Sequence, residues 1–331
     1  MAAPSLSVVM PVFNEERQLP ATIDALATAV DRSGFHAELL VVDDGSTDAS
    51  AEVARASALG RIVFHVDRQA NRGRFVARRV GLASATGEYV LFLDARVRLF
   101  PDALRFVHGR LPEEPVWNGH VHVEADSILG DFWRLLAELA WRDYFDDPRT
   151  TSFGLADFDR YPKGTTCFFA PRELVESAFA RFETRYSDIR LANDDTPILR
   201  DIASSERIHI SPEFACVYSP RTTAAGFVRH ALHRGVVFVD GHATPSSRFF
   251  PYVVAFFPLS AALARAAFRR PAVIPAAVAG CGVAAAAYGA RAGRTSRELA
   301  TLAVATPLYA VAHGIGMWRG LAEIVRARLA P

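Results

Sequence analysis

The sequence predicts an α/β protein with a mostly parallel central sheet, followed by a helical region of different composition. Two observations lead to this fold class. Over residues 5–93, short apolar runs alternate with segments whose apolar residues recur every three or four positions. Near Arg248 the composition then changes, and from there the chain has ten arginines, two glutamates, no aspartate and no lysine among long apolar stretches.

Four buried strands are expected in the first part of the chain, over residues 5–13, 38–43, 61–66 and 88–93. Residues 19–30 and 74–84 have helical periodicity, and Ser46 or Thr47 is expected to cap a helix that opens at residues 44–48. Parallel strands place active residues at their carboxyl ends. The side chains that fall there are those of Asn14, Asp43, Asp44 and Asp94.

Residues 100–247 are more mixed in pattern. They are expected to contain a helix over 129–141, a strand over 165–169 and another strand over 208–218. The formal net charge is +1 and 22% of the residues are charged, which gives no overall attraction to nucleic acid. The three cysteines, Cys167, Cys216 and Cys281, have no metal-binding spacing and are expected to be buried thiols.

Three apolar stretches follow Arg248, over residues 249–264, 271–290 and 299–318. The second and third approach the roughly 20 residues that cross a bilayer, whereas the first is shorter and is expected to lie in the membrane interface. Two crossings would place the arginines of 265–270 and 319–328 in the cytosol and those of 291–297 outside, which follows the positive-inside rule. The alternative is a buried helical hairpin. No signal peptide precedes the first strand, so a cytosolic catalytic region is expected.

Three motifs occur in order, over residues 9–16, 41–48 and 87–94, and together they resemble the inverting family 2 glycosyltransferases. The resemblance covers about residues 5–240. It implies a Rossmann-like glycosyltransferase A fold, with a catalytic domain over 1–247 and a membrane region over 248–331. Within the catalytic domain, residues 1–99 would form the nucleotide-binding half and residues 100–247 the acceptor-binding half.

The resemblance also implies roles for residues at the strand ends. A strand-end carboxylate can accept a hydrogen bond from a base edge, and Asp44 is the stronger candidate, with Asp43 as the weaker one that caps the turn. The alternative for both is an Asx-turn before a helix. The remaining nucleotide-sugar contacts that it implies are Pro11 and Phe13 at the base, Asn14 and Glu15 in the first motif, and Arg74 at the diphosphate. Arg78 and Arg79 either join Arg74 or form a solvated basic helix face.

Residues 94–96, Asp-Ala-Arg, resemble the family's Asp-x-Asp motif, in which the first Asp meets the ribose and the last coordinates Mg²⁺ or Mn²⁺. Here Arg96 replaces the last Asp, and an arginine cannot supply the oxygen ligand that such ions need. Three alternatives follow. Arg96 stands in for the metal at the diphosphate, or a divalent cation is held by Asp94 and substrate oxygens alone, or Arg96 forms a structural ion pair.

Farther along the chain, Asp194-Asp195 resembles the family's Glu-Asp motif, in which the Asp is the general base for the acceptor hydroxyl. Asp195 aligns with that base and Asp194 with the Glu, and the alternative is a helix N-cap cluster. The resemblance places Gly164 and Thr165 near the sugar or acceptor, and His233 and Arg234 near the acceptor or diphosphate. A Gln-x-x-Arg-Trp segment is absent from 229–235, which argues against a processive polysaccharide synthase.

The sequence therefore predicts a glycosyltransferase at the inner membrane, with a cytosolic catalytic domain. It would move a sugar from a nucleotide-diphosphate sugar to a lipid-linked or membrane-proximal acceptor, as in exopolysaccharide and lipid-linked oligosaccharide assembly. One alternative is a polyprenyl-phosphate monosaccharide synthase, whose phosphate nucleophile needs no general base. An alternative of another class is a non-catalytic membrane protein that binds a nucleotide sugar.

Overall fold

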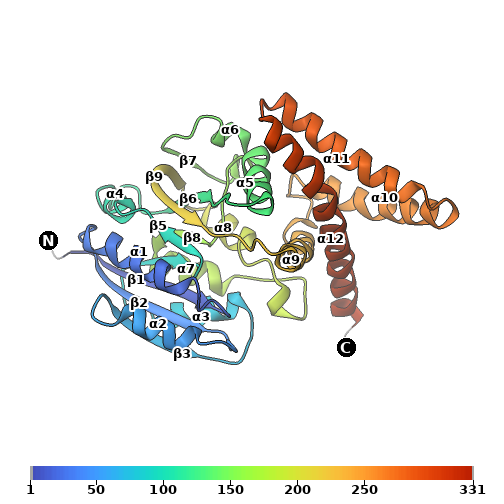
Figure 1. Ribbon diagram of the computed structural model, residues 1–331. Helices are drawn as coiled ribbons and strands as arrows, with labels where there is room; N and C mark the ends of the chain where they lie inside the picture. The colour runs from blue at the N-terminus through green and yellow to red at the C-terminus, as the bar shows by residue number, and fades with distance from the viewer. Residues whose placement is uncertain (1–2, 330–331) are drawn as a thin grey trace. The chain divides into compact units, whose positions relative to one another are not determined.

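The computed structural model describes residues 3–329, which divide into two compact units (Figure 1). Unit 1 comprises Met1–His122, Asp143–Glu183 and Asp194–Ser219. Unit 2 comprises Val123–Arg142, Thr184–Asn193 and Pro220–Pro331. The predicted division at residue 247 falls inside unit 2, and as a division of function it stays a prediction.

Unit 1 is built on a mixed sheet with the strand order β3-β2-β1-β4-β8-β6-β9-β5, and β7 pairs with β9. The strands are β1 Ser5–Val12, β2 His36–Asp43, β3 Val63–Arg68, β4 Tyr89–Leu93, β5 Val97–Leu99, β6 Trp117–Val123, β7 Thr151–Phe153, β8 Cys167–Pro171 and β9 Ile208–Tyr218. Strands β1 to β4 are joined by parallel pairs. β8 is antiparallel to both β4 and β6, so β6 runs in the same direction as β4.

Helices cover both faces of the parallel half, as the continuous apolar strands require. One face carries α1 Leu19–Asp31, α2 Ser50–Ala58 and α4 Ala103–His108, which share a buried core with alternate residues of β1 and β2. The other face carries α3 Arg74–Ser84 and α7 Arg172–Ala180. A Cβ added to Gly81 would approach Val9 Cγ1 to 2.5 Å, so this glycine lets α3 lie against β1. The remaining elements of unit 1 are α6 Arg142–Phe145, η1 Phe158–Arg160 and α8 Thr196–Ile202.

The predicted strands of the parallel half are confirmed, although β3 begins two residues later than expected, as does the antiparallel strand β8. The predicted helix cap at Ser46 or Thr47 is wrong. Helix α2 begins at Ser50, whose backbone N–H donates to Asp48 Oδ1 at 3.0 Å. Ser46 instead accepts a hydrogen bond from the backbone N–H of Asn14 at 2.9 Å, so it ties two strand-end loops together.

Unit 2 is helical. It contains α5 Ile128–Ala140, η2 Ile189–Leu191, α9 Ala224–His242, α10 Phe250–Arg269, α11 Val273–Arg291 and α12 Ser296–Leu329. Helices α5, α9 and α12 share an apolar cluster around Phe132, Trp133 and Phe227. Helices α10, α11 and α12 are each long and apolar enough to cross a membrane by length and composition. Helix α10 continues past the end of the predicted interfacial stretch and includes Pro258.

Candidate active site

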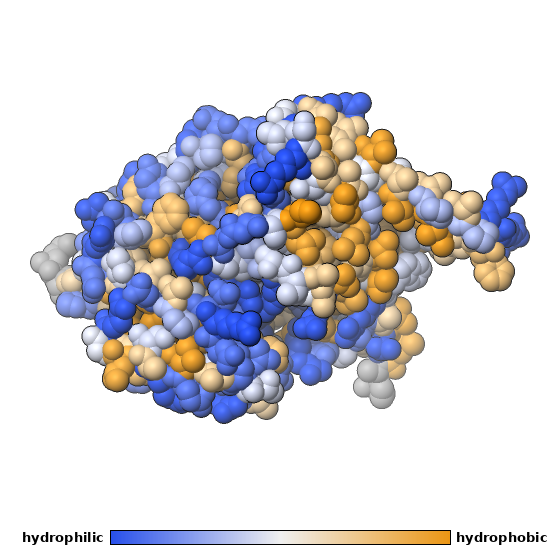
Figure 2. All heavy atoms as spheres, viewed as in Figure 1, coloured by the Kyte–Doolittle hydropathy of each residue, from blue (hydrophilic) through white to orange (hydrophobic). Residues whose placement is uncertain are grey.

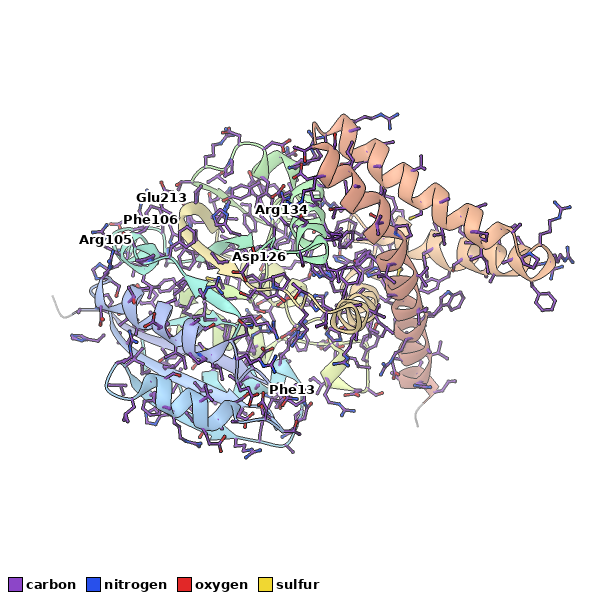
Figure 3. All side chains as sticks on the ribbon, viewed as in Figure 1. Phe13, Arg105, Phe106, Asp126, Arg134 and Glu213 are labelled. Atoms are coloured by element: carbon purple, nitrogen blue, oxygen red, sulfur yellow. The ribbon has the colours of Figure 1, made fainter. Side chains whose placement is uncertain are left out.

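The carboxyl ends of β1, β2 and β4 meet at one edge of the sheet, because the three strands are parallel and adjacent. Val12 lies beside Asp43, and Asp94 follows the last residue of β4. Phe13 lies just beyond the end of β1, with 42% of its surface exposed (Figure 3). Pro11 is the penultimate residue of β1 and is partly buried. The edge predicted from sequence therefore exists.

Asn14 fixes the loops after β1 and β2 to one another. Its backbone is left-handed, with φ of 56°, a conformation that asparagine tolerates better than most residues. Its Oδ1 accepts from the Thr47 backbone N–H at 2.8 Å, and the Glu15 N–H donates to Ser50 Oγ at 2.8 Å. These contacts give the first motif a structural role at the site edge.

The two aspartates after β2 organise different turns. Asp43 accepts from the Ser46 N–H at 2.9 Å, as the turn-capping alternative predicts, and lies 3.3 Å from Arg68 Nε. Asp44 accepts from the backbone N–H groups of Arg72 and Gly73, each at 2.8 Å, and from Gln69 Nε2 at 2.7 Å. Asp44 thus holds the turn that begins α3, and its predicted contact to a base stays a prediction.

Five charged residues at this edge form what we call the Arg78 cluster, which consists of Arg74, Arg78, Asp94, Asp194 and Asp195. Arg78 is at its centre, with a side chain only 1% exposed. Its guanidinium donates to Asp194 Oδ2 at 2.5 Å and to Asp94 Oδ1 at 2.7 Å. Arg74, one helical turn earlier, donates to Asp194 Oδ1 at 2.7 Å. Asp194 is fully buried, and its two oxygens hold both arginines in place because each accepts from one of them.

Asp195 differs from its neighbour because 33% of its side chain is exposed. Its Oδ1 accepts hydrogen bonds from the Thr165 hydroxyl and from the Thr165 N–H. Asp195 also occupies the N-cap position of α8, but its side chain makes no capping hydrogen bond there. The N-cap alternative is therefore wrong for the Asp195 side chain, which is oriented by Thr165 instead.

The cluster places two carboxylates in different electrostatic states. Burial raises the pKa of Asp94 above its usual value in spite of the nearby Arg78 and Arg74 guanidinium groups. At Asp195 the effect of burial is outweighed by those same arginines and by the Thr165 hydrogen bonds, so its pKa is lowered. The negative charge of Asp194 raises the pKa of Arg74 above its usual value. Asp195 is therefore ionised at neutral pH and is a weak base.

Arg96 does not stand free at the edge. Its Nε donates to Glu15 Oε1 at 2.8 Å, and its side chain is 18% exposed. This contact is the structural ion pair that was one of the three sequence alternatives for Arg96. Within residues 3–329, no group of three or more His, Cys, Asp or Glu side chains is arranged to hold a metal ion.

The remaining predicted residues divide between the two units. In unit 1, the Gly164 N–H donates to Asn118 Oδ1 at 3.0 Å, and Thr165 contacts Asp195. His233 and Arg234 lie on α9 in unit 2, where the Arg234 guanidinium lies 5.6 Å from the ring centroid of Trp133. Their role at the acceptor or diphosphate stays a prediction.

Arg78 is the residue whose position the sequence left open. The solvated-face alternative is correct for Arg79, which is exposed, and wrong for Arg78. Phe75, Arg78 and Leu82 follow helical spacing and are all buried, so Arg78 is on the inner face of α3. That spacing was a usable signal, because an arginine in a buried stripe needs carboxylate partners.

Comparison with known proteins finds a family that part of the chain resembles. Residues 7–147 match the model of the family described as Glycosyl transferase family 2. Over these residues the chain is similar to the glycosyltransferases of family 2. The matched region includes β2 to β4 and the strand-end residues Asn14, Asp43, Asp44 and Asp94.

Two curated relatives illustrate the range of family 2 proteins that the chain resembles. It is 36% identical over 101 residues to an undecaprenyl-phosphate 4-deoxy-4-formamido-L-arabinose transferase of Aeromonas hydrophila, a match that covers 30% of this chain and 31% of that relative. It is 33% identical over 150 residues to a PGL/p-HBAD biosynthesis glycosyltransferase of Mycobacterium bovis, which covers 44% of this chain and 54% of the relative. The chain thus spans between a third and about half of these relatives.

Solved structures confirm the fold. Mannosyltransferase PcManGT from Pyrobaculum calidifontis, in complex with GDP-Man and Mn²⁺, aligns with a TM-score of 0.54 at 22% identity, over 91% of this chain and 86% of that one. S. aureus TarS 1-349 in complex with UDP-GlcNAc aligns with a TM-score of 0.50 at 17% identity, over 71% of this chain and 66% of that one. The chain therefore has the Rossmann-like glycosyltransferase A fold that the sequence predicted.

Proposed function

We propose that this chain is an inverting glycosyltransferase that moves a sugar from a nucleotide-diphosphate sugar to a lipid-linked or membrane-proximal acceptor. The observation that carries the proposal is the Arg78 cluster at the carboxyl edge of β1, β2 and β4. It brings together guanidinium groups suited to a diphosphate and two partly exposed carboxylates, Asp94 and Asp195. Structures of the same fold that hold GDP-Man or UDP-GlcNAc support this class of donor.

The residues of the cluster take distinct roles in the proposed reaction. Arg74, with 41% of its side chain exposed, binds the diphosphate while Asp194 orients its guanidinium. Asp94 accepts from the ribose, and Asp195 accepts the proton of the acceptor hydroxyl. The hydroxyl oxygen attacks the anomeric carbon from the face opposite the diphosphate. The bond to the diphosphate breaks, its electron pair leaves with the diphosphate, and the configuration at that carbon inverts.

The residues at the Asp-Ala-Arg motif offer few oxygen ligands for a divalent cation. A divalent cation placed at the motif of residues 94–96 would find Asp94 alone among the expected ligands, since Arg96 replaces the second carboxylate. Asp94 Oδ1 already accepts from Arg78. These residues do not fit a protein-built cation site, and the proposed reaction includes no step through a metal. The partly exposed Arg74 guanidinium is the group of the cluster that can meet the charge of the leaving diphosphate.

The proposed acceptor follows from the apolar helices of unit 2. An enzyme held at a membrane meets a lipid-linked acceptor at a raised effective concentration. We place the enzyme at the inner membrane, with unit 1 in the cytosol where nucleotide sugars are available. The relative named as an undecaprenyl-phosphate transferase supports a lipid carrier as the acceptor class.

A second candidate, a polyprenyl-phosphate monosaccharide synthase, is favoured by one observation at Asp195. Arg74, Arg78 and Thr165 lower the pKa of this carboxylate, which makes it a weaker base for a hydroxyl. A lipid phosphate is already ionised and needs no base. The two candidates share the donor and differ in the nucleophile.

The test is a transfer assay with full-length protein purified in detergent. UDP-, GDP- and dTDP-sugars would each be supplied with a lipid extract, a polyprenyl phosphate or a polyprenyl-diphosphate sugar. The proposal predicts turnover of one donor, with a product of inverted anomeric configuration by NMR. Transfer to the diphosphate-linked sugar supports the leading candidate, and transfer to the phosphate alone supports the second. A product that retains the donor configuration would contradict the proposed mechanism.

A further inference from the structure

Six charged residues in unit 2 link α5 to the start of α12 and to the turn before it. We call this group the α5 network, and it consists of Asp131, Arg134, Glu138, Arg294, Arg297 and Glu298. Arg134 pairs with Glu298 at 2.9 Å, Arg294 with Glu138 at 2.7 Å and Arg297 with Asp131 at 3.2 Å (Figure 3 labels Arg134 on α5). Within α5, Arg134 also contacts Asp131 and Glu138. The turn between α11 and α12 is therefore fastened to α5.

The position of α5 relative to a membrane is fixed by the chain itself. Residue 122 before it and residue 143 after it both belong to unit 1. Helix α5 has 13 residues, fewer than a crossing needs, and carries the charges of the network. It therefore stays on the side of the membrane where unit 1 lies. The turn at residues 292–295, bound to α5, stays there as well.

The second half of α12 is held on the same side through α9. A Cβ added to Gly235 would strike the His313 carbonyl, and one added to Gly316 would strike the Leu232 carbonyl, so the two backbones are in close contact. Farther along, Gly320 packs against the Tyr186 hydroxyl, which donates to the Val236 carbonyl at 2.6 Å.

Helix α9 is in turn bound to residues 184–193, a segment of unit 2 that follows and precedes residues of unit 1. Asp240 accepts from Thr184 Oγ1 at 2.8 Å and from the N–H groups of Arg185 at 3.0 Å and Asn193 at 2.8 Å. The segment 184–193 joins unit 1 at both of its ends. Both ends of α12 therefore lie on the side of unit 1.

Helices α10 and α11 are much less buried than α12. They lie side by side as a hairpin, with 6% and 11% of their most apolar windows buried (Figure 1). Phe268 of α10 is 93% exposed and Val283 of α11 is 69% exposed. Figure 2 shows hydrophobic residues gathered over the C-terminal helices and hydrophilic residues at the far end of the hairpin, where α10 ends in Arg269 and Arg270.

We infer that the α10–α11 hairpin is the membrane-inserted element, entering and leaving the bilayer on the side of unit 1, and that α12 does not cross. Helix α12 instead adds an exposed apolar stripe of Val304, Leu308, Val311, Ile315 and Trp318, at spacings of four and three, that lies along the bilayer surface. The exposed arginines at both ends of the hairpin suit anionic headgroups. This arrangement keeps the predicted crossing by 271–290, adds α10 to it, and removes the crossing by 299–318 that the arginine count predicted.

This inference rests on the proposed membrane attachment, and labelling with a membrane-impermeant maleimide tests the two separately. In a full-length Cys281→Ser background, the two other cysteines are buried, and single variants Ser296→Cys and Ala56→Cys add exposed thiols at the start of α12 and on α2 of unit 1. We expect both to be labelled in inverted membrane vesicles and neither in intact spheroplasts. Labelling of Ser296→Cys only from the face opposite Ala56→Cys would overturn the inference while leaving membrane attachment intact.

Two further measurements test the inference even if a labelling variant does not fold. Recovery of the wild-type protein in the soluble fraction would overturn membrane attachment, and the inference with it. A Glu138→Cys, Arg294→Cys pair should be joined by a short bifunctional maleimide in native membranes, and its absence in folded protein would contradict the α5 network. The Glu138→Cys and Arg294→Cys single variants are the controls for non-specific joining.

Discussion

The Arg78 cluster of unit 1 and the α5 network of unit 2 use the same kinds of side chain for different ends. The Arg78 cluster has three carboxylates for two guanidinium groups, whereas the α5 network has three of each. Two of the three carboxylates of the Arg78 cluster, Asp94 and Asp195, have side chains that are 30% and 33% exposed. In the α5 network, Asp131 and Glu298 are 8% and 15% exposed.

This difference indicates that the Arg78 cluster is a binding site and that the α5 network is a structural contact between helices. In the α5 network the pairs join α5 to α12 and the turn before it, so removing a charge should weaken that packing without affecting chemistry at the sheet edge. In the Arg78 cluster, buried Asp194 pairs with both arginines, while Arg74, Asp94 and Asp195 stay partly exposed, where a substrate can reach them. Changes in the α5 network should therefore alter stability alone, and changes at the exposed carboxylates of the Arg78 cluster should alter activity.

The largest effect is expected from Asp195→Asn. Loss of the general base should lower transfer to a hydroxyl by about 10²- to 10⁴-fold while transfer to a lipid phosphate is spared. The thermal midpoint should change little, because Asn keeps an oxygen for Thr165. The measurement is initial rate on each acceptor, with Asp31→Asn, an exposed carboxylate at the end of α1, as the control. Full hydroxyl transfer by the variant would remove Asp195 from the mechanism.

Replacing Arg78 tests whether the cluster also supports the fold. In Arg78→Met, fully buried Asp194 loses one of its two ion pairs, and breaking a buried pair costs about 3–5 kcal/mol. Denaturant unfolding of the variant should show a loss of this order. The neighbouring exposed Arg79→Met should change the unfolding free energy by less than about 0.5 kcal/mol. Equal stability for the two variants would contradict the buried ion pairs described for Arg78.

A smaller effect on stability alone is expected from Arg134→Gln in the α5 network. The glutamine keeps hydrogen-bonding capacity but loses the charge that faces Asp131, Glu138 and Glu298, so a loss of about 1–3 kcal/mol is expected. Donor turnover per folded molecule should stay unchanged. A variant of wild-type stability with reduced turnover would reverse the distinction between the two regions.

A last effect concerns pH and His120 of β6, outside both groups. Burial, with a contribution from His122, lowers the pKa of His120 to about 4. In the unfolded chain the imidazole takes up a proton near pH 6.5, whereas the folded protein takes it up only near pH 4, so stability should fall between those values as pH is lowered. The slope should reach about 1.4 kcal/mol per pH unit. His120→Phe should flatten it, and an unchanged slope would exclude His120 as its source.

The parallel half of unit 1 could be predicted from sequence because its strands are buried on both faces and read as continuous apolar runs. Strand β6 could not, since Trp117–Val123 mixes asparagine, glycine and histidine with its apolar residues. The strand-end carboxylates were also found, because they follow those runs directly. Long-range pairs were not: Arg96 meets Glu15 from 81 positions away, and Arg294 meets Glu138 from 156. Such pairs depend on how elements pack, which local spacing does not encode.

We propose that the Arg78 cluster binds the diphosphate of a nucleotide sugar. Calorimetric titration of UDP, GDP and dTDP tests this binding most directly. Wild-type protein and Arg74→Gln would each be titrated with EDTA and with Mn²⁺. We predict that one nucleotide binds the wild type, that binding survives EDTA, and that Arg74→Gln weakens it at least about tenfold, the loss of one charge-assisted hydrogen bond. Binding that is equally strong in the variant, or binding that requires Mn²⁺, would contradict the account.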